Sequence, residues 1–131
     1  MAPPAQQAGG GPPRAVVVTG LGTTNPLAGD VAGTWQALGA GRCAVRTLPR
    51  EVTQVGGHEL PVRIGAPLAV EPSHVLAPRQ VRRLDRASQC ALVAAREAWQ
   101  QAGAPQVDAD RLAVVVSPGM GPVLSVIQAW D

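Results

Sequence analysis

Two short runs of valine constrain the fold of this chain more than any other feature. Val16 to Val18 form the first run, Val114 to Val116 form the second, and each is followed by two glycines. An apolar run without polar alternation is typical of a strand covered on both faces, as in parallel sheets flanked by helices. A helical pattern lies between the runs, so we expect an α/β fold with both strands buried.

Composition limits the classes of partner. The 131 residues suffice for one ordinary domain, and 46% of them are hydrophobic. All eleven basic residues are arginine, against nine acidic residues, so the formal charge is only +2. This excess is too small to indicate nucleic-acid binding, but it allows a local basic patch for an acidic partner.

Cysteine usage and the N-terminal composition indicate a cytoplasmic protein. Cys43 and Cys90 form no C-x-x-C pair, so neither a disulfide scaffold nor a zinc site is expected. Residues 1–13 contain no signal-peptide pattern, and no stretch of the chain is long and apolar enough to span a membrane. The proline, glycine, alanine and glutamine of residues 1–13 predict that this segment is a disordered tail.

Local signals predict the first helix. Asn25 and Pro26 mark a turn, Asp30 is a suitable N-cap, and Gly39 and Gly41 end the helix. The helical spacing of Val31, Trp35 and Leu38 predicts that this face is buried. Residues 42–77 are rich in loops, with one short strand expected around residues 60–64.

A longer helical pattern follows. Pro78 is suited to its start, Asp85 is an internal cap candidate, and Gly103 is a stop signal. Small side chains on one face allow close approach to a sheet or another helix. These are Ala87, Ala91, Ala94, Ala95, Ala98 and Ala102.

Further elements are expected after this helix. Asp108 and Asp110 predict a turn before a strand at residues 112–116, and residues 121–130 begin a last helix. Two buried strands and three helices cannot cover both faces of a sheet. We therefore expect residues 14–131 to be part of a larger fold, with apolar surface left exposed.

The glycine pairs suggest dinucleotide binding only weakly. In the G-x-G-x-x-G pattern that begins at Gly20 the sixth position is Asn25, and in the one that begins at Gly119 it is Leu124, so both sites depart from the pattern. The alternative is that these glycines allow tight turns or close backbone packing.

No catalytic centre follows from the residues themselves. The chain has no G-x-S-x-G elbow, no lysine for a P-loop and no H-x-x-x-H pair. His58 and His74 lie in loop-like segments, and Cys90 lies among alanines, where a structural role is favoured. Cys43 lies in a loop directly after Arg42, and nothing in the sequence around it supports a reactive thiol.

Four arginines form a basic cluster. Arg79, Arg82, Arg83 and Arg86 are spaced by three and four residues, so on one helix they share a side. Such a cluster is either a solvated face or a binding patch.

Five blocks in register resemble the start of β-ketoacyl-acyl-carrier-protein synthases, most closely the synthase II type or a polyketide ketosynthase. They are VVVTGLGTTNPL, DVAGTWQALGAG, LPVRIGAP, RRLDRASQCALVAAREAW and RLAVVVSPGMG. The resemblance covers residues 15–131. It implies a homodimeric thiolase-like fold with α-β-α-β-α layers, of which this chain is an N-terminal fragment, and it implies no cofactor and no metal.

Family chemistry is a decarboxylating Claisen condensation. A cysteine accepts the acyl group from acyl carrier protein, and two histidines assist attack by the malonyl unit. These three residues lie in later segments of the family, and the cysteines and histidines of this chain match none of them. The resemblance thus implies a fragment that is inactive alone. A non-catalytic subunit that docks carrier protein, or pairs with a synthase, is the alternative.

Two family roles transfer by position. Arg79, Arg82 and Arg83 align with basic residues that contact acyl carrier protein. Met120 aligns with an aliphatic residue that borders the acyl-chain pocket, in a segment where Pro118 departs from the family pattern. Proline lacks the backbone N–H and restricts φ, which changes the shape expected for this loop.

Overall fold

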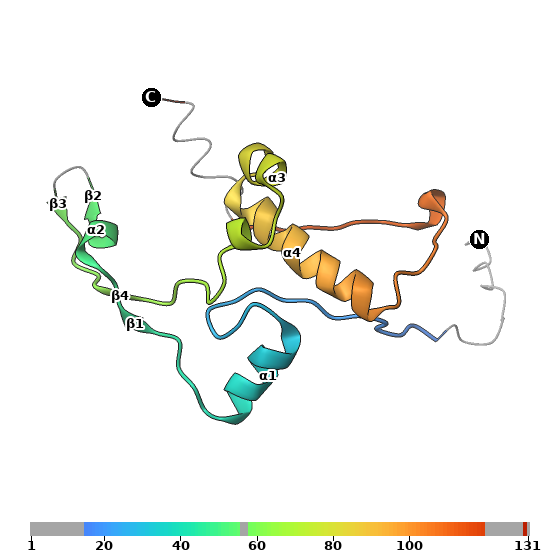
Figure 1. Ribbon diagram of the computed structural model, residues 1–131, viewed down its shortest axis with the longest axis horizontal. Helices are drawn as coiled ribbons and strands as arrows, with labels where there is room; N and C mark the ends of the chain where they lie inside the picture. Colours follow the sequence, from blue (N-terminus) through green and yellow to red (C-terminus); the bar gives the residue numbers. More distant parts are fainter. Residues whose placement is uncertain (1–14, 56–57, 120–129, 131) are drawn as a thin grey trace, which may run out of the picture.

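Helices and short β-ladders make up the structure, a computed structural model that describes residues 15–55, 58–119 and 130 (Figure 1). The elements are, in order, α1 (Val31–Gly39), β1 (Arg46–Thr47), α2 (Arg50–Thr53), β2 (Gln54–Val55), β3 (His58–Glu59), β4 (Ile64–Gly65), η1 (Pro72–His74), α3 (Pro78–Arg83), α4 (Arg86–Gln101) and η2 (Ala109–Arg111). No helix in the described part of the chain is long and apolar enough to cross a membrane.

Helix α1 begins and ends where the sequence predicts. The Asp30 carboxylate accepts a hydrogen bond from the Gly33 N–H at 2.6 Å, which caps the first turn. Upstream, the Asn25 side chain accepts from the N–H groups of Leu27 and Ala28 and so forms the expected turn. Gly41 follows the helix with φ +63°, a conformation that glycine adopts without strain.

The prediction about the buried face of α1 is wrong. Trp35 and Leu38 are 76% and 55% exposed, and the buried residue of the helix is Ala37. The helix is held at its N-terminal end and through this alanine. Of the apolar stripe that the helical spacing identified, Val31 is half-buried, while Trp35 and Leu38 are open to solvent.

An antiparallel arm, which contains the short helix α2, extends away from helices α1, α3 and α4 (Figure 1). Strand β1 pairs with β4, with Arg46 opposite Gly65, and β2 pairs with β3, with Gln54 opposite Glu59. The single strand expected around residues 60–64 is therefore wrong in its boundaries. Only Ile64 of that range lies in a strand, because the arm consists of two short ladders.

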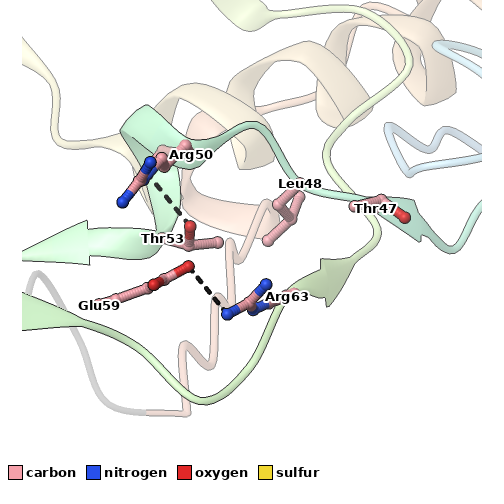
Figure 2. A pocket seen from close by; sticks show the side chains of 6 residues that line it. All are labelled: Thr47, Leu48, Arg50, Thr53, Glu59 and Arg63. Atoms are coloured by element: carbon pink, nitrogen blue, oxygen red, sulfur yellow. Dashed lines mark hydrogen bonds and ion pairs between the residues drawn. The ribbon is translucent and has the colours of Figure 1, made fainter.

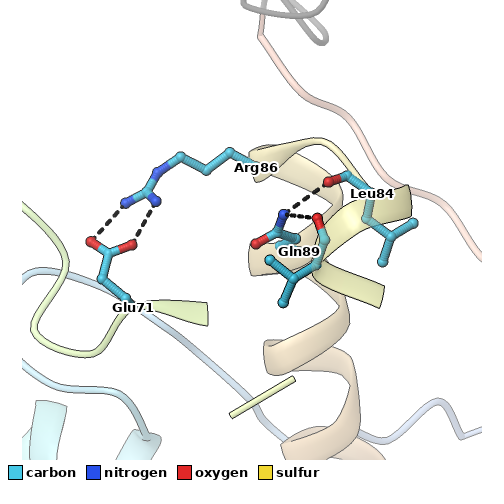
Figure 3. A network of polar contacts seen from close by, with 5 residues as sticks. Glu71, Leu84, Arg86 and Gln89 are labelled. Atoms are coloured by element: carbon cyan, nitrogen blue, oxygen red, sulfur yellow. Dashed lines mark hydrogen bonds and ion pairs between the residues drawn. The ribbon is translucent and has the colours of Figure 1, made fainter. Parts of the chain in front are cut away.

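Two helices, α3 and α4, replace the single long helix of the sequence analysis. The backbone becomes extended at Leu84 and Asp85, and the Asp85 carboxylate caps α4 by accepting from the Ser88 N–H at 3.1 Å. The Gln89 amide donates to the carbonyls of Val81 and Leu84 at 3.1 and 2.8 Å (Figure 3). These bonds satisfy carbonyls at the end of α3 that have no helical partner.

The alanine face of α4 packs directly against the glycine segment at residues 20–23, which confirms the close-packing interpretation of these glycines. A Cβ atom on Gly22 would lie 1.8 Å from the Ala94 carbonyl oxygen, and one on Gly20 would lie 2.0 Å from that of Ala98. No side chain larger than hydrogen fits at either position.

Glu97 of α4 ties two other segments to this contact. Its carboxylate accepts from the Thr23 N–H at 2.9 Å and from the Val31 N–H at 2.8 Å. Val31 is the first residue of α1, where free N–H groups and the helix dipole favour a negative charge. One carboxylate therefore fixes both the glycine segment and α1 onto α4.

The valine runs do not form the buried strands that we expected. Val16, Val17 and Val18 are 96%, 73% and 78% exposed, and Val114, Val115 and Val116 are 81%, 90% and 59% exposed. Neither run is assigned to a strand, because neither has a backbone partner among the described residues. The expectation that apolar surface would stay exposed is confirmed. Of the residues expected in a last helix, all but Trp130 lie outside the described part of the chain.

The glycine contact generates a stability prediction. Gly22→Ala places a methyl group onto a backbone carbonyl that cannot move aside, and we expect it to lower the free energy of unfolding by roughly 2 to 3 kcal/mol. Urea titration followed by helical circular dichroism measures this change. Gly39→Ala is the matched control, since nothing lies within 4 Å of its added Cβ atom. An equal loss in both variants would contradict the packing argument.

Candidate functional site

Helix α3 presents the three arginines of the sequence prediction. Pro78 begins the helix, and the Gln80 side chain accepts from the Ala77 N–H at 3.2 Å, which closes the first turn. Arg79, Arg82 and Arg83 are all exposed. None of the three forms an ion pair with a described residue. Their positive charge is therefore available to a partner.

Arg86 does not belong to this patch, which corrects the four-residue cluster. It lies on α4, beyond the break between the helices, and its guanidinium donates to both Glu71 carboxylate oxygens at 2.6 and 3.0 Å (Figure 3). The hydrogen bond from Arg86 lowers the pKa of Glu71, although partial burial opposes the shift. The same bond raises the pKa of Arg86. This pair joins the segment before η1 to α4.

Arg96 is a cation beside α3 that the sequence analysis did not assign to the site. Its guanidinium donates to the Gln80 side-chain oxygen at 3.0 Å, across the two helices. No spacing rule connects a residue in the middle of α4 to α3. The contact follows only from the angle at which α4 leaves the break at Asp85.

Carboxylates close to the patch are engaged elsewhere. Asp85 accepts from the hydroxyl and the N–H of Ser88, and these hydrogen bonds lower its pKa. Glu97 points to the N–H groups of Thr23 and Val31. Neither carboxylate forms an ion pair with the arginines of α3. The surface of α3 is accordingly cationic.

The glycine segment is not arranged as a nucleotide loop. The N–H groups of Leu21 and Thr23 donate to the side chains of Gln101 and Glu97. A pyrophosphate needs such N–H groups free and would be repelled by the Glu97 carboxylate. The geometry therefore favours the packing role of these glycines over dinucleotide binding.

The cysteines and histidines form no catalytic pair in the described part of the chain. Cys43 is exposed in the loop after α1, and Cys90 is half-buried in α4. His58 lies on β3 and His74 in η1, and no hydrogen bond joins a cysteine to a histidine among the described residues. Met120 lies outside the described residues, so its pocket role stays a prediction.

A pocket with charged side chains lies on the arm and has a volume of about 350 Å³ (Figure 2). Arg63 pairs with Glu59 at 3.1 Å, and the Thr53 hydroxyl donates to the Arg50 carbonyl at 3.2 Å. These side chains bond to each other and to the backbone. They do not converge on a common point as ligand-binding groups do.

The family model "Beta-ketoacyl synthase, N-terminal domain" matches residues 13–128. The chain is 35% identical over 116 residues to 3-oxoacyl-[acyl-carrier-protein] synthase 2 of Mycobacterium tuberculosis, covering 88% of this chain and 27% of the relative. It is 34% identical over 121 residues to the protein of the same name from Coxiella burnetii, covering 90% of this chain and 28% of the relative.

A relative from a different pathway has similar identity. The tetracenomycin polyketide synthase ketoacyl synthase alpha subunit of Streptomyces glaucescens is 34% identical over 109 residues, covering 81% of this chain and 25% of the relative. The chain thus spans about a quarter of the length of the curated relatives that it matches.

Acid should weaken the link between Glu71 and Arg86. A carboxyl with a lowered folded pKa stabilises the fold above its unfolded pKa, about 4.3, and this contribution is lost as pH falls through the folded pKa. The two side chains are 39% and 51% exposed, so solvent limits the contribution to about 0.5 kcal/mol. In Glu71→Gln, the free energy of unfolding should therefore fall less steeply as the pH is lowered through this range. The control is Glu51→Gln, at an exposed position of α2, which should leave the acid dependence unchanged. Identical acid profiles for wild type and Glu71→Gln would contradict the assignment.

Proposed function

Because the chain belongs to the β-ketoacyl synthase family, we propose that it serves as the N-terminal part of a 3-oxoacyl-acyl-carrier-protein synthase. The observation that carries the proposal is the cationic surface of α3, in a chain whose relatives are condensing enzymes. Acyl carrier protein is the acidic partner that this surface fits. The proposed setting is the cytosol, where reducing conditions keep free cysteines such as Cys43 and Cys90 from forming disulfides.

The reaction proposed for the whole enzyme joins two carbon chains. The acyl group is first held as a thioester on a cysteine of the synthase. Loss of CO₂ from the malonyl thioester then provides a carbanion that attacks the acyl carbonyl and releases the cysteine as thiolate. We propose that the cysteine and the two assisting histidines come from polypeptide outside these 131 residues, since Cys43, Cys90, His58 and His74 match none of them.

Within that reaction, the contribution of this chain is recruitment of the carrier. Arg79, Arg82 and Arg83 project from one short helix and have no ion pair among the described residues. A concentrated patch of one sign steers an oppositely charged partner and orients it during the encounter. Docking at α3 would hold the acyl thioester at a fixed distance from the rest of the synthase.

The exposed valine runs support assignment to a thiolase-like fold. A sheet covered by helices on both sides would bury the side chains of Val16–Val18 and Val114–Val116, which are exposed in this chain. We propose that they become neighbouring strands once further polypeptide covers them, in the layered homodimer typical of the family. The burial of these valines would stabilise the assembly by about 25 cal/mol for each Å² removed from water.

A non-catalytic subunit is the second candidate function. The docking surface is present while no described cysteine pairs with a histidine, so binding without turnover is chemically self-consistent. Service in polyketide synthesis is the corresponding alternative for the pathway, since one relative is a polyketide ketoacyl synthase subunit.

The 131-residue chain should have no condensing activity. Acyl and malonyl carrier proteins are supplied together, and formation of 3-oxoacyl carrier protein is followed by mass spectrometry, with a full-length synthase as the positive control. We expect no product, because no thiolate nucleophile with its histidines is available. Turnover by this chain alone would overturn the proposal.

Charge reversal on α3 should weaken carrier binding. The double variant Arg82→Glu with Arg83→Glu turns the attraction of an acidic partner into repulsion, and we expect affinity to fall roughly tenfold or more. Calorimetric titration with holo acyl carrier protein at low and high salt measures this loss. The double variant Arg42→Glu with Arg111→Glu, at two exposed arginines outside α3, is the matched control and should bind like wild type. Equal weakening by both variants would mean that net charge, and not α3, determines binding.

A further inference from the structure

Helix α3 is too short to be stable by itself. It has six residues, none of them buried, whereas isolated helices below about 12 to 15 residues are marginal in water. Its helical conformation therefore depends on the elements beside it. The hydrogen bonds that join it to α4 among the described residues all come from side chains of α4.

The C-terminal end of α3 is held by one amide. The Gln89 side chain donates to the Val81 carbonyl at 3.1 Å and to the Leu84 carbonyl at 2.8 Å (Figure 3). Carbonyls in the last turn of a helix have no helical partner and otherwise bind water. Without this amide, the last turn of α3 would lose its contact with α4.

The first turn of α3 is held by a guanidinium. Arg96 donates to the Gln80 side-chain oxygen at 3.0 Å, and the same oxygen accepts from the Ala77 N–H at 3.2 Å. Gln89 and Arg96 are seven residues apart, so they lie on one side of α4. One side of α4 thus holds both ends of α3, through polar groups alone.

The segment before α3 is anchored in a different way. Pro72 and Leu76 are buried, and η1 packs against α4. Glu71 also accepts two hydrogen bonds from Arg86. Burial and this ion pair can hold residues 71–76 on α4 while α3 is released.

We propose that α3 opens as a separate unit: it leaves α4 and unfolds while η1 and α4 stay packed, and Gln89 and Arg96 set this equilibrium. Local unfolding is expected where few apolar side chains are buried, as in α3. Arg79, Arg82 and Arg83 share one side only when α3 is helical. Opening therefore disperses the cationic patch, and closure assembles it.

Amide hydrogen exchange of the 131-residue chain, resolved by NMR, tests this opening. The Val81 and Leu84 N–H groups, which donate to backbone carbonyls at the start of α3, report on it. After correction for intrinsic rates they should exchange roughly tenfold faster, or more, than N–H groups in the middle of α4. Low concentrations of urea should accelerate exchange steeply in α4 and only slightly in α3, because local opening exposes less surface than global unfolding. Equal rates with equal urea dependence in both helices would overturn the inference.

The variant Gln89→Met keeps a side chain of similar length and helix propensity but removes the donor. Exchange at Val81 and Leu84 should become roughly fivefold to tenfold faster, as expected for the loss of about one hydrogen bond. The Leu76 N–H, which reports on η1, and the N–H groups of α4 should keep their rates. The matched control is Gln100→Met, at an exposed glutamine of the same helix, which should leave the exchange of α3 unchanged.

The variant Arg96→Met removes the other contact and should accelerate exchange in α3 by a smaller factor, because its hydrogen bond is exposed. If either variant accelerates exchange in α3, η1 and α4 equally, the side chain stabilises the whole fold and the inference is overturned. If circular dichroism shows Gln89→Met to be misfolded, the urea dependence of wild-type exchange decides. No partner is present in these measurements, so their outcome is independent of the proposed carrier binding.

Discussion

The contact between the glycine segment and the alanine face of α4 supports the rest of the structure. Gly20 and Gly22 approach the carbonyl oxygens of Ala98 and Ala94 so closely that no Cβ atom fits between them. Glu97 then uses its two carboxylate oxygens to hold Thr23 and the first turn of α1. Since four residues of the described chain are buried, namely Ala37, Thr53, Pro72 and Leu76, this backbone contact and its hydrogen bonds replace an extended core.

The break at Leu84 and Asp85 determines the electrostatics of the candidate site. If the helix continued, Arg86 would extend the row of arginines, and Arg96 would lie farther along the same axis. The cap at Asp85 instead turns the chain, so that Arg86 pairs with Glu71 and Arg96 reaches Gln80. One local hydrogen-bonding signal thereby changes which guanidinium groups a partner meets.

Local features were predictable from the sequence, whereas burial was not. The cap at Asp30, the turn at Asn25, the cap at Asp85 and the turn at Asp108 all depend on a side chain that bonds to a backbone N–H a few residues away. The valine runs and the stripe of Trp35 and Leu38 carry equally clear patterns, yet they are exposed. An apolar pattern predicts that a face can be covered, but the covering atoms must come from elsewhere.

Sequence alone determined the family, both ends of α1, the start of α3, the end of α4 and the three arginines of α3, because each depends on residues within one short segment or on their order along the chain. Tertiary structure alone decided that Arg86 leaves the basic patch, that Arg96 joins it, and that Gly20 and Gly22 serve packing. Those outcomes depend on which segments meet in space. These contacts depend on the extended backbone between α3 and α4 and on the carboxylate of Glu97. Glu97 is distant in sequence from Thr23 and Val31, whose N–H groups it binds.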